Sequence, residues 1–435
     1  MGERAATSQR KVALATLTGA TLEWYDFFLY GTASALIFNK QFFPSLSPAA
    51  GTLAAFSTFA VGFIARPLGG LVFGHYGDRI GRKMTLVVSL VLMGIGSTLI
   101  GVLPGFATIG VWAPILLVAL RVVQGIGLGG ENAGANLMAL EHAPSDQRNR
   151  YAGFPQMGTP AGLVLANTVF LVTSTVLPAA AFTSWGWRIP FLLSAALVVV
   201  GLVIRMRVTE TPSFAKAVQR NEIVRFPLKE ALSVGAGRLV LTLVLSIANS
   251  AVAYLFLVFS LSYGTAQLGL KRQFLLITVT VSAVLWLGAI PLWTSIADRR
   301  GRRGMFVWGS VALLVWAAAF FPLLNTKSPA VIVVALLGMG LIIPVTHCVQ
   351  GAIVADTFPA NVRYSGSSLL LQCAALLGGG LAPLISTAIL NGTGATTGVS
   401  AYITAVCALS LLAAVLAFRT APVPTRIDAP VAARL

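Results

Sequence analysis

Long apolar runs separated by short polar connections dominate the chain. A helix that crosses the hydrocarbon core of a bilayer needs about 20 mostly apolar residues. Twelve runs of that kind cover residues 13–37, 50–74, 85–104, 111–140, 151–177, 187–207, 238–266, 274–297, 305–325, 329–355, 365–390 and 398–418. They do not show the two-residue alternation that is typical of strands in a membrane barrel. The pattern therefore predicts an all-α integral membrane protein with twelve transmembrane helices.

The positions of the basic residues predict how these helices are oriented. Cytoplasmic loops of membrane proteins carry an excess of Lys and Arg. With the N-terminus inside, 23 of the 30 Lys and Arg residues fall on the cytoplasmic side and 5 outside. Two more, Arg66 and Arg121, lie within predicted spans. We therefore expect cytoplasmic N- and C-termini, and the net charge of +17 needs no nucleic-acid partner.

Composition excludes several classes of protein. Only 10% of the residues are charged and 57% are hydrophobic, whereas soluble proteins are about 25% charged. The 3 cysteines and 3 histidines show no metal-ligand spacing. No glycine-rich phosphate loop is present, so ATP is not expected to drive the protein. We expect neither an enzyme, a metal site nor a cofactor.

The chain divides into two similar halves. The longest polar connection, residues 208–237, follows the sixth predicted span. The run Gly-Asp-Arg-Ile-Gly-Arg-Lys over 77–83 follows the second span, and Ala-Asp-Arg-Arg-Gly-Arg-Arg over 297–303 follows the eighth, 220 residues later. We therefore expect an N-terminal six-helix bundle (1–207), a cytoplasmic loop (208–237), and a C-terminal six-helix bundle with a short tail (238–435). Repeated halves are typical of alternating-access transporters.

The repeated run has the chemistry of a gate. Glycines permit a tight turn, and an acid at a helix end can pair with an arginine or with a helix N-terminus. Such pairs can hold the cytoplasmic side shut and break when the halves move; the alternative is a basic membrane anchor. The predicted gate residues are Arg66, Asp78, Arg79, Gly81, Arg82, Lys83, Asp298, Arg299, Gly301 and Arg302.

Six runs of residues resemble signatures of a known family. Residues 74–83 (GHYGDRIGRK) and 121–131 (RVVQGIGLGGE) are similar to two signatures of the major facilitator superfamily. Four further runs resemble the metabolite:proton symporter family within it: EWYDF (23–27), EHAP (141–144), WGWRIPF (185–191) and FPANVRYSG (358–366). That family includes permeases for α-ketoglutarate, citrate, shikimate, and proline or betaine. The resemblance implies the major facilitator fold and a place in the bacterial inner membrane.

Two carboxylic acids interrupt the first span. Glu23 and Asp26 are three residues apart and therefore share a helix face. Ionisable groups inside a membrane are costly and are functional candidates by default. Proximity and low dielectric both favour uptake of a proton, so we predict proton coupling here. The alternative is that both acids pair permanently with Arg66 or Arg121.

Arg121 lies near the middle of the fourth span. A guanidinium grips a carboxylate with two parallel donors, so Arg121 can bind an anionic substrate, act as the counter-ion of Asp26, or alternate between them. Gln124 and Glu131 share one face of the same span. Glu131 lies about 15 Å on the cytoplasmic side of Arg121. It is a candidate second proton site or gate partner, or a helix-packing ion pair.

The remaining predicted substrate-binding residues are polar side chains within spans: Tyr25, Asn249, Tyr254 and Gln350. His347 titrates near neutral pH, so it is a candidate for a proton or substrate role. We expect proton-coupled uptake of a small carboxylate-bearing or zwitterionic metabolite by a monomer surrounded by membrane lipids. A proton-coupled efflux antiporter is the alternative.

Overall fold

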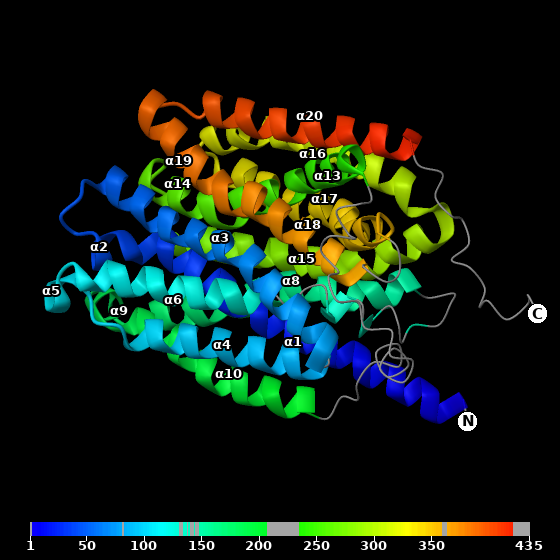
Figure 1. Cartoon of the computed structure of the whole chain (residues 1–435). Coiled ribbons are helices and arrows are strands. Elements are labelled where there is room, and N and C mark those ends of the chain that lie inside the picture. Colours follow the sequence, from blue (N-terminus) through cyan, green and yellow to red (C-terminus); the bar gives the residue numbers. More distant parts are fainter. Residues whose placement is uncertain are drawn as a thin grey trace, which may run out of the picture.

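The computed structural model describes residues 2–80, 82–129, 134–136, 138–139, 143, 148–206, 235–358 and 363–420. For residues 2–11, 74–80, 82, 148, 363–364 and 420 it describes the backbone alone. Every regular element in these ranges is a helix, and the long helices run side by side along one common direction (Figure 1). Helix α1 begins, and helix α20 ends, at the same end of the bundle.

The helices before the long connection are α1 (Gly2–Ala33), η1 (Ser34–Phe38), α2 (Asn39–Phe42), α3 (Pro48–Ile80), α4 (Arg82–Val102), α5 (Phe106–Ile109), α6 (Trp112–Gly129), α8 (Arg148–Val176), α9 (Ala179–Ser184), η2 (Gly186–Arg188) and α10 (Ile189–Met206). Those after it are α13 (Ala236–Tyr254), η3 (Leu255–Phe259), α14 (Ser260–Ala266), α15 (Arg272–Arg300), α16 (Arg302–Asn325), α17 (Pro329–Ala355), α18 (Arg363–Ala375), η4 (Leu376–Gly380), α19 (Leu381–Thr393) and α20 (Thr397–Thr420).

The two sets of helices pack in the same pattern. In the first set α1 packs on α8, α3 on α6 and α4 on α10. In the second, α13 packs on α18 and η4, α15 on α17 and α16 on α20. The sets meet mainly where α8 contacts α15 and α17, and where α3 contacts α18, η4 and α19. The repeat seen in the sequence is therefore accompanied by a repeat in helix packing.

Eleven segments in the described part of the chain are long and apolar enough to cross a membrane. They match eleven of the twelve predicted spans. The first predicted span, 13–37, corresponds to α1 and η1, which are not among the eleven. The polar residues around Glu23 and Asp26 lower the mean hydropathy of this helix. The two acids thus help to explain why this helix is not among the eleven apolar segments.

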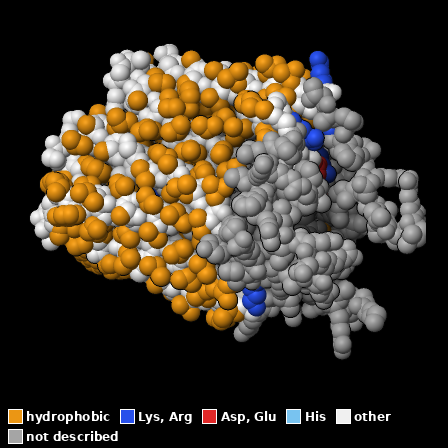
Figure 2. Space-filling model, viewed as in Figure 1, with side chains coloured by type: hydrophobic (Ala, Val, Ile, Leu, Met, Phe, Trp, Pro, Cys, Tyr) orange, Lys and Arg blue, Asp and Glu red, His pale blue; other side chains and the backbone are white. Residues whose placement is uncertain are grey.

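The lateral surface of the bundle is apolar. Hydrophobic side chains are widespread over the described part of the face shown in Figure 2, and the visible Lys and Arg side chains gather near one end. Large apolar side chains are exposed on several helices, among them Val176, Trp308 and Val315. Such a wide apolar surface would be costly in water, so the surface indicates contact with lipid tails.

Three π-helical segments interrupt the long helices. η1 follows α1, η3 follows α13, and the two begin 221 residues apart, at matching places in the two halves. All five residues of each segment are buried. η1 contacts α14, and η3 contacts α1, so both lie where the two halves meet. π-turns of this kind are frequent at functional sites.

Glycines bring α3 and α6 into backbone contact. A Cβ at Gly125 would collide with the carbonyl oxygen of Gly62, and one at Gly129 with that of Arg66. Small residues allow membrane helices to approach this closely. The crossing places Arg66 of α3 and Arg121 of α6 near one another inside the protein.

Candidate functional site

The two acids of α1 lie in the interior and are not ion-paired. Glu23 is 2% exposed and Asp26 is 4% exposed. The Ser194 hydroxyl donates a hydrogen bond of 2.5 Å to Asp26 Oδ1. Glu23 lies within electrostatic range of Arg66 and Arg205, but among the described residues no arginine comes within 4 Å of either carboxylate. The ion pairing considered above is therefore not seen in this conformation.

Arg121 is held by one edge of its guanidinium. Its Nη1 donates to Gln124 Oε1 at 3.0 Å, and Gln124 Nε2 donates to Ser97 Oγ at 2.7 Å. The guanidinium carbon lies 3.8 Å from the centre of the Tyr30 ring, in cation–π geometry. Its Nε and Nη2 have no hydrogen-bond partner in the described part of the chain. Arg121 thus keeps its other edge available.

Arg66 shows the same combination of burial and free donors. Its guanidinium carbon lies 4.2 Å from the centre of the Phe27 ring and 4.3 Å from that of Phe63. Nε and Nη2 are again without a partner among the residues described. The α3–α6 crossing carries Arg66, which was predicted as a gate residue, to the central residues of the protein.

Tyr254 enters this region from the second half of the chain. Its ring packs against Phe27, Phe28, Phe59 and Phe63, with ring centres 5.2–5.9 Å apart. Its hydroxyl lies beside Arg66, and among the described residues it has no partner at full hydrogen-bond geometry. The two arginines and Tyr254, which we call the arginine cluster, therefore present several free donors in an aromatic enclosure.

A second group of polar residues lies in the other half, and we call it the amide cluster. Asn249 Nδ2 donates to Gln350 Oε1 at 2.7 Å and lies 3.1 Å from His347 Nδ1. The Trp286 ring packs edge-to-face on His347, with ring centres 5.2 Å apart. The sequence prediction placed Asn249 and Gln350 at one site, and the structure brings them into direct contact.

Two predicted residues stand apart from the clusters. The Tyr25 hydroxyl donates to the Pro190 carbonyl at 2.6 Å, which joins α1 to α10 and leaves no hydroxyl hydrogen for a substrate. Glu131 and Gly81, and the side chains of Asp78, Arg79 and Arg82, lie outside the described residues. Lys83, at the start of α4, donates to the Met206 carbonyl at 2.7 Å.

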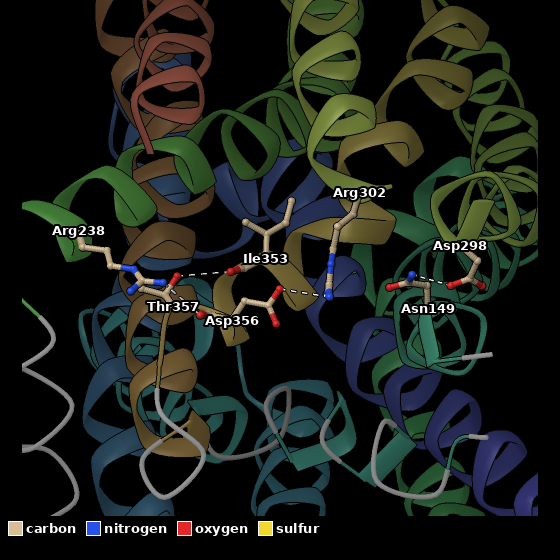
Figure 3. Close-up of polar contacts among 7 residues, drawn as sticks. All are labelled: Asn149, Arg238, Asp298, Arg302, Ile353, Asp356 and Thr357. Atoms are coloured by element: carbon tan, nitrogen blue, oxygen red, sulfur yellow. Dashed lines mark hydrogen bonds and ion pairs between the residues drawn. The ribbon is translucent and has the colours of Figure 1, made fainter. Parts of the chain in front are cut away.

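The second copy of the gate run makes a contact between the halves. Asn149 of α8 donates a hydrogen bond of 2.5 Å to Asp298 Oδ1 at the end of α15 (Figure 3). Gly301 turns the chain between α15 and α16 with a φ of 85°, which glycine adopts at little cost. Arg299 is exposed. The acid of the repeated run thus bonds to the opposite half.

A basic residue of the same run makes its contact within its own half. Arg302 forms an ion pair of 3.3 Å with Asp356, at the end of α17 (Figure 3). Arg238 of α13 donates to the Asp356 carbonyl at 3.3 Å. These contacts join helices of the same half. Asp298 and Arg302 are therefore in different interactions, although they are four residues apart.

Sequence reasoning missed several residues that shape the site. Ser194 and Tyr30 supply a hydrogen bond and a stacking surface. A Cβ at Gly62 would lie 2.9 Å from Arg121 Nε, so this glycine makes room for the guanidinium. Arg205, near the end of α10, is buried, donates to the Leu86 carbonyl and lies within electrostatic range of Glu23. Only its position at a span end was visible in the sequence.

Comparison with known proteins identifies the family. The family model described as "Major Facilitator Superfamily" matches residues 16–383. The chain is a member of the major facilitator superfamily. The predicted family resemblance is thereby confirmed, and the protein is a multi-pass membrane transporter.

Relatives within the superfamily are transport proteins rather than enzymes. The chain is 40% identical over 419 residues to the inner membrane metabolite transport protein YhjE of Escherichia coli, with 95% of each chain covered. It is 40% identical over 412 residues to the shikimate transporter of the same organism, with 94% of each chain covered. Identity to the Escherichia coli proline/betaine transporter is 32%, over 97% of this chain and 86% of the other.

Solved structures confirm the major facilitator fold. The proton:xylose symporter XylE bound to 6-bromo-6-deoxy-D-glucose superposes with a TM-score of 0.76, covering 96% of each chain at 18% identity. The partially occluded inward-open form of XylE from Escherichia coli gives a TM-score of 0.73 and covers 97% of this chain and all of the other, at 19% identity.

Proposed function

We propose that this protein is a proton-coupled symporter of the bacterial inner membrane that imports a small carboxylate-bearing or zwitterionic metabolite. Protons serve as the coupling ion, and no other cofactor takes part. The substrate carboxylate binds at the arginine cluster, and Asp26 and Glu23 carry the proton. The named substrates of the relatives, shikimate and proline or betaine, all carry a carboxylate.

One observation carries this proposal: Arg66 and Arg121 are buried, and Nε and Nη2 of each have no hydrogen-bond partner in the part of the chain that the structure describes. A buried donor without a partner costs about 1–3 kcal/mol, and more when it is charged. A carboxylate that accepts from a guanidinium edge recovers that cost. The enclosure by Phe27, Phe63 and Tyr30 suits the apolar body of a small metabolite.

The unpaired acids support proton coupling. Because neither Glu23 nor Asp26 is tied to an arginine within 4 Å, each can change charge without breaking an ion pair. Ser194 can donate to a charged Asp26 and accept from a protonated one. Binding of an anion at Arg121 lowers the positive potential near Asp26 and so favours its protonation. Substrate and proton therefore bind cooperatively.

Transport is proposed to proceed by alternating access. Residues 1–207 and 238–435 move as two six-helix bundles joined by 208–237, and α1 with η1 supplies the twelfth span. The basic loops put both termini in the cytoplasm. The Asn149–Asp298 hydrogen bond then lies at the cytoplasmic end, where it joins the halves. The proposal needs one chain, so the transporter acts as a monomer.

Uptake by proteoliposomes tests the function. Purified protein is reconstituted, an inward proton gradient is imposed, and accumulation of radiolabelled shikimate, citrate, 2-oxoglutarate, proline and betaine is followed with and without an uncoupler. Symport predicts accumulation of at least one substrate that collapses with the uncoupler. Outward movement driven by an inward proton gradient would instead establish the antiporter, and absence of gradient dependence would refute both.

A further inference from the structure

Hydrogen bonds in the amide cluster define the orientation of each side chain. Gln350 Nε2 donates to the Ser246 carbonyl at 3.2 Å, so Gln350 Oε1 must face Asn249. Asn249 therefore presents Nδ2 to Gln350, and its Oδ1 accepts from the Thr346 hydroxyl at 3.1 Å. Amide orientation is assigned from such networks, and here both neighbours of Asn249 agree.

This orientation also determines the tautomer of His347. The same Asn249 Nδ2 lies 3.1 Å from His347 Nδ1, so Nδ1 must act as the acceptor. The ring proton is then on Nε2. A doubly protonated ring would place N–H against N–H, and turning the Asn249 amide would set its oxygen against Gln350 Oε1. The network therefore holds His347 neutral, with an Nε2–H donor.

Two donors in this region lack a well-formed hydrogen bond. His347 Nε2 and Trp286 Nε1 are both buried and meet no acceptor at hydrogen-bond geometry in the described ranges, although the backbone of Gln156 lies beside the His347 ring. Their rings are perpendicular, with an interplanar angle of 86°. In an edge-to-face pair only one ring can direct an N–H at the face of the other. At least one of the two N–H groups therefore remains unsatisfied in the interior.

Both donors lie on helix faces that border the opposite half. Gly351, one turn after His347, is close enough to α8 that a Cβ there would lie 3.1 Å from Gln156 Nε2. Ile290, one turn after Trp286, lies 3.5 Å from the position of a Cβ on Gly153 of α8. Residues four apart share a helix face. The donors thus lie near the boundary along which alternating access would open the protein.

Helix α13 contributes a residue to each of the two clusters. Asn249 and Tyr254 both belong to α13 and are five residues apart, which is about 7.5 Å of helix. Tyr254 reaches the phenylalanines around Arg66, whereas Asn249 holds His347. This stretch of helix is about as long as a small molecule of a few carbon–carbon bonds.

We propose that Trp286 Nε1–H and His347 Nε2–H form a second substrate subsite that binds a neutral acceptor oxygen, a hydroxyl or a carbonyl, at the end of the substrate remote from its carboxylate. This inference rests on the proposed function and narrows it to oxygenated carboxylates. A quaternary ammonium group has no acceptor to offer these donors. An apolar end would leave at least one of them unpaired.

The test uses pairs of probes that differ in the oxygen alone. Suitable pairs are shikimate and cyclohex-1-ene-1-carboxylate, citrate and tricarballylate, and 2-oxoglutarate and glutarate. Dissociation constants are measured by calorimetry with the purified full-length protein. We expect the wild type to prefer the oxygenated member of at least one pair by about tenfold or more, as two neutral hydrogen bonds predict.

Conservative variants then show which side chains cause the preference for the oxygenated probe. Trp286→Phe removes the indole N–H and keeps an aromatic ring, and His347→Asn keeps an amide group near the position of Nδ1 while removing Nε2–H. Each variant is expected to reduce the preference about threefold to tenfold, with unchanged binding of the deoxygenated member. Trp316→Phe is the matched control, since its indole N–H already donates to the Ala335 carbonyl at 3.0 Å.

Several outcomes overturn the inference. They are equal wild-type binding within all three pairs, no binding of any probe, tighter binding of glycine betaine than of every oxygenated probe, and equal losses for both members of a pair in the variants. Failure of the proposed function looks different: the wild type then binds the probes but shows no proton-driven uptake. A thermal unfolding midpoint within a few degrees of wild type establishes that each variant is folded.

Discussion

The two halves share one packing pattern but differ in the chemistry of their interiors. In the first half, Glu23, Asp26, Arg66 and Arg121 are all buried, and aromatic rings pack on both guanidinium groups. In the second half, the corresponding interior contains amides, His347 and Trp286, and none of the buried side chains described there is acidic or basic apart from this neutral histidine. Duplication thus gave two scaffolds, of which one holds the ionic chemistry.

This division has a physical advantage. Each charge inside a membrane is costly, and an interior without charges in the second half adds nothing to that cost. Neutral donors in the other half can still discriminate substrates, because an unpaired buried N–H penalises the wrong ligand. Under the proposed function, the charged residues of the first half couple transport to protons, and the neutral donors of the second half select the substrate. Each of these two roles can be tested by substitution.

The largest effect is expected at Arg121. Arg121→Gln removes the charge and the free guanidinium edge, so binding of every carboxylate should weaken by more than about 100-fold, consistent with loss of a charged hydrogen-bond pair. Calorimetric titration with the six carboxylate probes measures this. Arg188→Gln is the control, because Arg188 bonds to carbonyls of Ser184 and Leu103 at the rim of the bundle. Retained affinity in Arg121→Gln would remove the arginine cluster from binding.

Asp26→Asn should separate transport from coupling. The amide oxygen can still accept from Ser194, but the side chain no longer takes up a proton. We expect gradient-driven accumulation to fall to the equilibrium level while exchange of labelled for unlabelled substrate continues. Ser194→Ala, which removes the partner and keeps the acid, should retain accumulation. Normal accumulation by Asp26→Asn would assign the coupling to another residue, with Glu23→Gln the next variant to measure.

A smaller effect is expected at Tyr254, where the second half touches the ionic site. Tyr254→Phe removes the free hydroxyl and preserves the packing on Phe27 and Phe63. Substrate affinity should fall about threefold to tenfold, the value of one neutral hydrogen bond. Substrate binding by Tyr254→Phe as tight as in the wild type would show that the hydroxyl takes no part in binding. Tyr25→Phe breaks the α1–α10 hydrogen bond instead and should reduce thermal stability rather than affinity.

The smallest effect is expected at the end of the bundle where the gate run lies. Asn149→Ala removes an exposed hydrogen bond between the halves, so it should shift the population towards the form open on that side by about twofold to tenfold. Labelling of a cysteine placed in the α8–α15 contact reports the shift. Arg302→Gln breaks an ion pair within one half and should leave labelling unchanged. Equal shifts in both variants would contradict the division into two moving bundles.

The sequence predicted the spans and the family well because both depend on local composition and short motifs. It also placed Asp26, Arg121 and Tyr254 in the interior, where charge and polarity in an apolar run must be buried. It did not predict that Arg66 joins the central residues, nor that the Tyr25 hydroxyl binds Pro190. Those outcomes depend on the rotation of each helix and on close glycine crossings, and a hydropathy pattern contains neither.

Ser194 and Arg205 are residues near the acids of α1 that could not be predicted from the sequence. Both are on α10, far in sequence from the acids of α1, and nothing in their own surroundings marks them. A serine in a span usually bonds to its own helix, and an arginine at a span end usually extends to water. Their roles follow from the packing of α10 beside α1.

The π-helical segments η1 and η3 have a consequence for how this protein can change over evolution. One extra residue in a turn rotates everything beyond it by about 100° relative to a regular helix. In the leading helix of each half, the segment before the π-helical residues and the segment after them are consequently set at independent angles. A substitution that changes the orientation of one segment can therefore leave the packing of the other intact.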